Sequence, residues 1–278
     1  MRWLACPVLL VLAACGEAPS SPPTSGLRIA TTSPAVGIML RDFGADDLAV
    51  GRSGYDVALD PALPVVGDAA GVDLERLSGL GATHVYYESG ASAAPVGLTE
   101  LADEIGFELR AFELTSLEQL ADLASNVHAL VSEEVNPGPP PAERFEAALA
   151  TDADLAAAGR VLLLMPGTPA AALGPGSVHH EVLVRLGGVS ALGGGRPYMP
   201  LDVEDVLTIS PDAIVLLAPG KDDDWRALLG PIAELPIPAV ERGRVAVLRD
   251  DEVLMASTST LRYADELRER LRAWAREP

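Results

Sequence analysis

Two runs of alternating short strands and amphipathic helices constrain the fold of this chain more than any other feature of its sequence. The first run covers residues 27–115, and its first helix is marked by Ser33, a good N-cap, and by Pro34, which fits the first helical position. The second run covers residues 160–278. Strands that alternate with helices imply right-handed crossovers and mostly parallel sheets. The pattern therefore predicts an α/β fold with two Rossmann-like lobes.

The stretch between the two runs, residues 116–159, is expected to be a helical connector. It divides into helical segments over 116–134 and 143–158, and the proline-rich run 137–141 separates them. No helix continues through that run, because each proline removes a backbone donor and clashes with the preceding turn. The second segment, at ~1.5 Å per residue, would extend over roughly 24 Å and is predicted to cross between the lobes.

An internal repeat supports one helix–strand unit of the same kind in each lobe. Residues 72–87 and 201–216 both read Φ-Asp-Φ-Glu-x-Φ, where Φ is apolar, followed by a turn and an apolar strand. In each copy the aspartate precedes the helix as its expected N-cap. The glutamate, Glu75 or Glu204, lies in the first helical turn, where the helix dipole favours a negative charge. One copy in each run supports the two-lobe interpretation.

The amino terminus carries the features of an export signal. Arg2 precedes the apolar run 4–14, which is too short to span a bilayer but fits the apolar region of a signal peptide. The run ends in Leu-Ala-Ala-Cys, which resembles the lipobox of bacterial lipoproteins and predicts that Cys15 carries the lipid. We therefore expect residues 1–14 to be removed, residues 15–26 to form a flexible tether, and the lipid to be the only membrane anchor. An ordinary signal peptide with an incidental cysteine is the alternative.

Composition and the absence of motifs weigh against several classes of function. The formal net charge is −20, and so acidic a surface would repel nucleic acid. The chain has no phosphate-binding glycine loop with lysine, no nucleophile elbow and no two-histidine zinc motif, so no catalytic site, metal site or cofactor is predicted. His179 and His180 are adjacent on an expected helix and diverge by ~100°. An enzyme is therefore the less favoured class.

An ordered set of stretches resembles the periplasmic binding proteins that serve cobalamin, haem and ferric-siderophore ABC importers. No single stretch is specific, but together they span nearly all of residues 27–278 in the order found in that family. The stretches are 28–35, 63–68, 72–77, 174–177, 186–188, 201–206, 210–215 and 240–248.

The resemblance implies two lobes joined by a helical connector, with a ligand cleft between them. It implies an exported monomer, in the periplasm or on the outer cell surface, that carries a metal chelate to an ABC permease dimer with its ATPase. It also implies that Glu75 and Glu204, one on each lobe, dock into arginine pockets of the two permease subunits. The chain departs from the family in its connector, which is usually one unbroken helix there.

Aromatic and polar residues near expected strand ends are the candidates for ligand binding. Tyr55 falls where members of this family often place an aromatic ring, and a tyrosine face with a polar tip suits a corrin, porphyrin or aryl ligand. Cobalamin is the favoured ligand, and ferric siderophore and haem are the alternatives. A lipoprotein that senses or stores its ligand without a transporter is the alternative function. The candidate set is Tyr55, Tyr86, Tyr87, Ser89, Arg196 and Tyr198, with only one of the adjacent pair Tyr86 and Tyr87 expected at the cleft.

Overall fold

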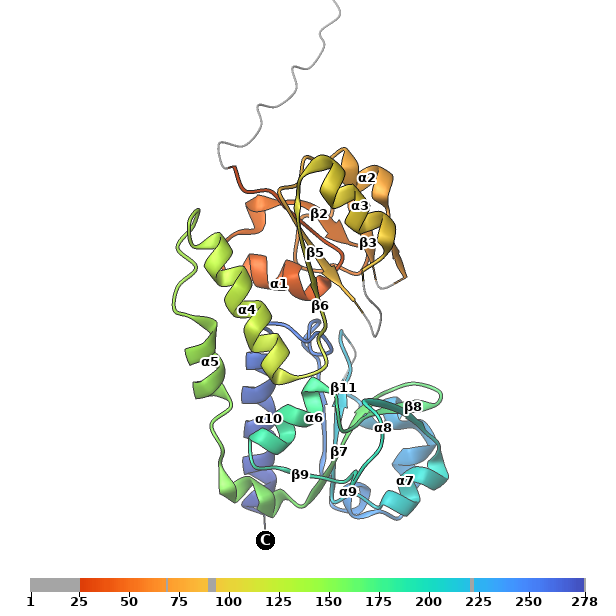
Figure 1. Ribbon diagram of the computed structural model, residues 1–278. Helices are drawn as coiled ribbons and strands as arrows, with labels where there is room; N and C mark the ends of the chain where they lie inside the picture. Colours follow the sequence, from red (N-terminus) through yellow and green to blue (C-terminus); the bar gives the residue numbers. More distant parts are fainter. Residues whose placement is uncertain (1–25, 69, 90–93, 221–222, 278) are drawn as a thin grey trace, which may run out of the picture.

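A computed structural model of the chain describes residues 26–68, 70–89, 94–220 and 223–277. Figure 1 shows two α/β lobes, one above the other, with a layer of helices running along one side of both. The predicted signal peptide, Cys15 and nearly all of the predicted tether lie outside the described residues. No helix within the described ranges is long and apolar enough to cross a membrane.

The N-terminal lobe is built on one sheet with the strand order β4-β3-β2-β1-β5-β6. Its paired strands are parallel except for β4, which runs antiparallel to β3. The elements are β1 (Ile29–Thr31), α1 (Pro34–Asp42), η1 (Asp46–Leu48), β2 (Ala49–Ser53), β3 (Val65–Asp68), β4 (Gly71–Val72), α2 (Leu74–Ser78), β5 (His84–Glu88), α3 (Val96–Ile105) and β6 (Glu108–Phe112).

The strand order of this lobe contains a reversal that matters for ligand binding. The chain passes from β1 to β2 on one side, and later returns to place β5 on the other side of β1. The connections that leave the carboxyl ends of β1 and β5 therefore diverge. In open α/β sheets such a reversal opens a crevice at the carboxyl ends of the strands, and ligands bind there.

The C-terminal lobe is built on a second sheet, with the order β10-β8-β7-β11-β12 and β9 paired to β7. β7, β11 and β12 are parallel, while β8 and β10 add antiparallel strands at one edge. The predicted α/β fold class with two mostly parallel sheets is confirmed. The elements are β7 (Arg160–Met165), β8 (Ala170–Leu173), α6 (Val178–Arg185), β9 (Val189–Ser190), β10 (Tyr198–Leu201), α7 (Val203–Ile209), β11 (Ala213–Leu217), α8 (Trp225–Leu229), η3 (Gly230–Glu234), α9 (Pro238–Glu241), β12 (Val245–Leu248) and α10 (Thr260–Ala275).

The connector differs from the prediction in its second helical segment. α4 (Leu117–Val131) precedes the proline-rich run, but the predicted continuous helix over 143–158 is wrong: α5 (Pro141–Ala148) and the 3-10 helix η2 (Ala153–Ala158) replace it. The break occurs at Asp152, whose extended backbone begins a new helical turn and whose side chain accepts a hydrogen bond from the Asp154 amide. Arg272 of α10 binds the same carboxylate at 2.9 Å. These interactions stabilise a cap where the pattern predicted a helix interior.

One hydrophobic core continues through both lobes. It includes Val36 and Met39 of α1, Leu120 of α4 and Leu267 of α10, all fully buried. Each sheet also has a separate core on its opposite face. Because α1, α4 and α10 contribute side chains to this one core, the lobes are packed together along the side where these helices lie in Figure 1. We expect lobe closure to be small, since moving the lobes would disrupt close packing.

Candidate functional site

A cavity of about 290 Å³ lies between the lobes, at the carboxyl ends of β1 and β5 where the strand order reverses. Both lobes contribute to its walls, so the structure brings together segments that are distant in the sequence. The lining residues are Thr32, Pro34, Ala35, Ser53, Tyr55, Glu88 and Leu114 from the N-terminal lobe, and Tyr198, Leu254, Met255 and Ala256 from the C-terminal lobe.

The N-terminal wall is organised around the end of β1. The Ser33 side chain caps α1 by accepting a hydrogen bond from the Ala35 amide, and its hydroxyl donates to Oε2 of Glu88 at 2.5 Å. The Glu88 amide in turn donates to the Thr32 hydroxyl at 3.3 Å. The residues that begin α1 therefore also hold the carboxylate of Glu88 at the cavity wall.

The C-terminal wall is the segment that follows β12, which carries Leu254, Met255 and Ala256. A second cavity of about 310 Å³ shares Leu254 with the first and continues along the carboxyl ends of β7 and β11. The second cavity is lined by the C-terminal lobe alone, and because it adjoins the first at Leu254 we call the two together the interlobe cleft. The lining of the second cavity is apolar throughout: Met165, Pro166, Pro169, Ala171, Leu217, Ala218, Pro219 and Leu254.

Two tyrosines line the interlobe cleft, one from each lobe. Tyr55 follows β2 and is 65% exposed, and Tyr198 begins β10 and is 56% exposed. Partial burial, and then the charge of Glu88, raise the pKa of Tyr198. Both rings are large apolar surfaces left open in a cavity, which is the arrangement that a flat ligand needs.

The other sequence candidates do not line the interlobe cleft. Tyr86 is 2% exposed and lies beneath the helical layer, and Tyr87 packs against the separate core on the opposite face of the sheet. They point to opposite faces because they are consecutive strand residues, and the cleft is at the strand end rather than on either face. Arg196 is exposed in the loop before β10. The structure thus unites Tyr55 and Tyr198 and separates the remaining candidates from them.

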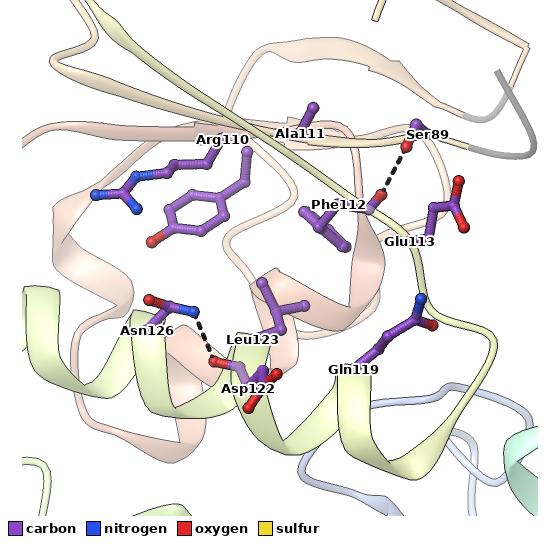
Figure 2. A pocket seen from close by; sticks show the side chains of 10 residues that line it. Ser89, Arg110, Ala111, Phe112, Glu113, Gln119, Asp122, Leu123 and Asn126 are labelled. Carbon is purple, nitrogen blue, oxygen red and sulfur yellow. Dashed lines mark hydrogen bonds between the residues drawn. The ribbon is translucent and has the colours of Figure 1, made fainter. Parts of the chain in front are cut away.

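Ser89 and Tyr86 line a different cavity, of about 450 Å³, between β6 of the N-terminal lobe and α4 of the connector. Figure 2 shows its polar side chains, several of which are already engaged. Ser89 Oγ donates to the Phe112 carbonyl, Asn126 Nδ2 donates to the Asp122 carbonyl, and Arg110 pairs with Glu108. This cavity is larger than either of the other two, but it shares no lining residue with them and receives nothing from the C-terminal lobe. We therefore place the candidate site in the interlobe cleft.

His179 and His180 lie outside both cleft cavities. His179 is buried, its Nε2–H donates to the Val253 carbonyl at 2.7 Å, and its ring meets Tyr263 edge-on. Burial lowers the pKa of His179, and burial also lowers the pKa of His180. In the described parts of the chain, no group of three His, Cys, Asp or Glu side chains could hold a metal ion.

Glu88 and the segment around Met255 are site residues that sequence reasoning missed. Glu88 is the last residue of β5, and its place between Tyr87 and Ser89 was a usable signal, because strand carboxyl ends converge on ligands. The segment with Leu254 and Met255 carried no such signal, since only the packing of the two lobes brings it opposite β1.

The two repeat glutamates are both exposed, one on each lobe. Glu75 lies on α2, where Asp73 caps the helix by accepting from the Arg76 amide. Glu204 lies on α7, where Asp202 and Asp205 form a reciprocal capping box. In Figure 1, α2 and α7 lie on the side of their lobes away from α4, α5 and α10.

Comparison with solved structures finds binding proteins with the same architecture. The periplasmic vitamin B12 binding protein BtuF of Vibrio cholerae superimposes with a TM-score of 0.68 at 20% identity, over 90% of this chain and 98% of that chain. The chain shares its fold. The haem-binding protein RhuT of Roseiflexus sp. RS-1 gives 0.65 at 21% identity, over 91% and 100%. The iron uptake ABC transporter substrate-binding protein PiuA of Streptococcus pneumoniae gives 0.62 at 16%, over 88% and 91%. No family model and no curated protein matches the sequence.

This fold of periplasmic binding proteins is the one that the sequence resemblance predicts. At these identities the likeness concerns the backbone. The ligand has to be argued from the side chains that line the cleft of this chain.

Proposed function

We propose that this protein is the substrate-binding component of an ABC importer and that it carries a metal chelate between its two lobes. The observation that carries the proposal is the interlobe cleft, where Tyr55 and Tyr198 approach one cavity from different lobes at a switch point of the sheet. Support comes from the shared fold, since neighbours with that fold are named for binding vitamin B12, haem and iron compounds. A binding role, rather than catalysis, fits this lining.

Cobalamin is the favoured ligand within this proposal, ahead of ferric siderophore and haem. The second cavity of the cleft is apolar, and the tyrosines add flat surface without a formal charge at neutral pH. An apolar cleft with a few convergent polar groups is typical of sites for large organic ligands.

Delivery to a transporter is the second part of the proposal. Glu75 and Glu204 are exposed carboxylates on separate lobes, and two such charges fix the orientation of a binding protein on a dimeric permease. The proposal includes export and an acyl chain on Cys15, which would keep the protein beside its permease at the membrane.

Ligand binding is tested by thermal unfolding of the protein from Gly16 onward with cyanocobalamin, hemin, and hydroxamate and catecholate ferric siderophores. A ligand at ~100 times its dissociation constant adds roughly 2.7 kcal/mol, which shifts the midpoint by a few degrees. We expect one chelate to shift the midpoint and the others to leave it unchanged. The absence of any shift at saturating concentrations would overturn the chelate assignment.

Transporter docking is tested by Glu75→Arg combined with Glu204→Arg, in cells that depend on this protein for uptake. We expect uptake to fall at least tenfold while ligand affinity stays within twofold, because both side chains lie outside the cleft. Glu100→Arg with Glu234→Arg makes the same change in net charge at exposed positions of the same lobes, and is the matched control. Normal uptake by the first double variant would favour the alternative, a lipoprotein that senses or stores its ligand.

A further inference from the structure

The interlobe cleft has an unbalanced charge. Among the described residues that line its two cavities, Glu88 alone carries a formal charge at neutral pH, and none is an arginine, lysine or histidine. The other lining groups are hydroxyls, tyrosine rings, prolines, methionines and aliphatic side chains. A bound ligand therefore meets one carboxylate and, from the described lining, no cation.

Glu88 is held in place but not neutralised. Its Oε2 accepts the hydrogen bond from the Ser33 hydroxyl at 2.5 Å, and its amide is bound to Thr32. In the described part of the chain no cationic side chain forms an ion pair with Glu88, and Oε1 accepts no hydrogen bond. Tyr198, from the opposite lobe, is near enough for the Glu88 charge to raise its pKa. One carboxylate oxygen thus remains available to a ligand in the cleft.

The chemistry of the ligand follows from this carboxylate. A ligand that places a carboxylate or catecholate near Glu88 would bring like charges together in a partly desolvated cleft, without a compensating cation from the described lining. A ligand that presents N–H or O–H groups would instead form charge-assisted hydrogen bonds, which are stronger than neutral ones. The net charge of −20 acts in the same direction, because it slows the approach of anions.

We propose that Glu88 is a specificity-determining residue and that the cleft takes a neutral or cationic chelate which donates hydrogen bonds, such as one bearing primary amides, and excludes anionic chelates. This inference rests on the proposed binding function. It assigns the charge class of the ligand, which neither the fold nor the aromatic residues determine.

The test is titration calorimetry of the protein from Gly16 onward with four probes. Cyanocobalamin and the cationic trihydroxamate ferrioxamine B represent the accepted class, and hemin and a ferric tris-catecholate represent the excluded class. We expect a probe of the accepted class to bind at least a hundredfold more tightly than either anion. Tighter binding of an anionic probe to the wild-type protein would overturn the inference and leave the proposed function standing.

Two substitutions test whether the preference against anionic probes comes from Glu88. Glu88→Gln keeps the shape of the side chain and removes its charge, so it should weaken binding of the accepted probe at least tenfold. Glu88→Arg should reverse the preference in favour of the anions. Glu113→Gln, on an exposed residue that lines the cavity of Figure 2 rather than the cleft, is the control and should leave affinity unchanged. Thermal midpoints show whether each variant is folded.

The outcomes distinguish an error in the role of Glu88 from an error in the proposed binding function. Binding of an accepted probe that Glu88→Gln leaves unchanged would overturn the role of Glu88 alone. Failure of all four probes to bind would overturn the proposed function, and the inference with it.

Discussion

Arg41 of α1 forms a two-point ion pair with Glu252, which lies in the opposite lobe in the segment after β12. Arg41 Nη1 binds Glu252 Oε1, and Nη2 donates to Oε2 at 3.1 Å. Arg262 of α10 donates to the same Oε2 at 2.6 Å, and the Glu252 side chain is only 7% exposed. The pair joins the first helix of one lobe to the segment that lines the cleft in the other.

Removing Arg41 should destabilise the protein, because the largely buried carboxylate of Glu252 would lose one of its two cationic partners and keep only Arg262. We expect Arg41→Ala to lower the free energy of unfolding by about 1–3 kcal/mol, less than for a fully buried pair because Arg41 is one-third exposed. Urea denaturation measures this change. Arg270→Ala is the control, since its contact with Glu266 is long and exposed and should contribute less than about 0.5 kcal/mol.

The same pair should give an acid-dependent contribution to stability. Burial alone would raise the pKa of Glu252, but hydrogen bonds from Arg41 and Arg262 outweigh it and hold the pKa below its usual value of 4.5. A carboxylate with a lowered pKa stabilises the fold above its unfolded pKa, and this stability is lost as the pH falls through the folded value. The difference between wild type and Arg41→Ala should therefore shrink below about pH 4.5. A constant difference down to pH 3 would contradict an ionic role.

His179 should make the fold sensitive to mild acid. Its Nε2–H donates to Val253, so a second proton would go to Nδ1, which is buried and has no partner. Burial holds the pKa of His179 below its usual value of 6.5, so the unfolded chain takes up the proton first. Stability should fall as the pH drops below about 6.5, by up to ~1.4 kcal/mol per pH unit for one proton.

His179→Phe keeps an aromatic ring against Tyr263 and removes the titration. Its unfolding free energy should change less between pH 7 and pH 5.5 than that of the wild type, whatever its stability at pH 7. Equal pH slopes for the two proteins would show that His179 is not the group responsible.

Sequence patterns predicted most of the parallel strands, but they missed the parallel strands β3 and β9 and the antiparallel strands β4, β8 and β10. β1, β5, β7 and β11 are apolar runs between helical patterns, so their strand character is local. β8 has the sequence Ala-Ala-Ala-Leu, which carries no strand preference, and it is extended because it pairs with both β7 and β10. β10 contains Pro200, which is accommodated because β10 is at the sheet edge.

The residues of the candidate site also differ in how far the sequence could predict them. Tyr55 was proposed from the family resemblance, and Tyr198 because it shortly precedes the second copy of the internal repeat. The sequence could not decide which of Tyr86 and Tyr87 faces the helical layer. Alternation shows that consecutive strand residues point to opposite faces of a sheet, but not which face the helices cover. Leu254 and Met255 become cleft residues only through the contact between the lobes.

The two cleft tyrosines should contribute to ligand binding through their rings. Tyr55→Ala and Tyr198→Ala should each weaken the bound chelate about tenfold, which corresponds to ~1.4 kcal/mol. The corresponding phenylalanine variants keep the ring and should bind within about threefold of the wild type. Tyr87→Phe, outside the cleft, is the control in the same calorimetric titration. An alanine variant with wild-type affinity would remove that tyrosine from the site.

Gly37 of α1 should be needed to position Tyr55. A Cβ at Gly37 would come 1.8 Å from Asp56 Oδ2, so Gly37→Ala must displace that carboxylate. Asp56 Oδ1 accepts hydrogen bonds from the amides of Ala58 and Leu59, which hold the turn after Tyr55. We expect a loss of about 1–3 kcal/mol in stability and a several-fold loss in ligand affinity.

Gly79→Ala is the matched control for this prediction, because a Cβ there meets only the Arg76 carbonyl, at 3.7 Å. Denaturation and calorimetry on both variants separate a general effect of alanine from the contact with Asp56. Wild-type stability and affinity for Gly37→Ala would show that Asp56 adjusts without moving the turn.

The core shared by the two lobes has a consequence for how the chain folds. Val36 of α1 and Trp274 of α10 belong to one hydrophobic cluster, although they are near opposite ends of the described chain. Neither lobe can complete its core until α10 has been synthesised, and contacts between such distant segments form slowly. A nascent chain would therefore stay incompletely folded until late in its synthesis. For a protein proposed to be exported, that delay extends the time during which the chain can still be threaded through a translocation pore.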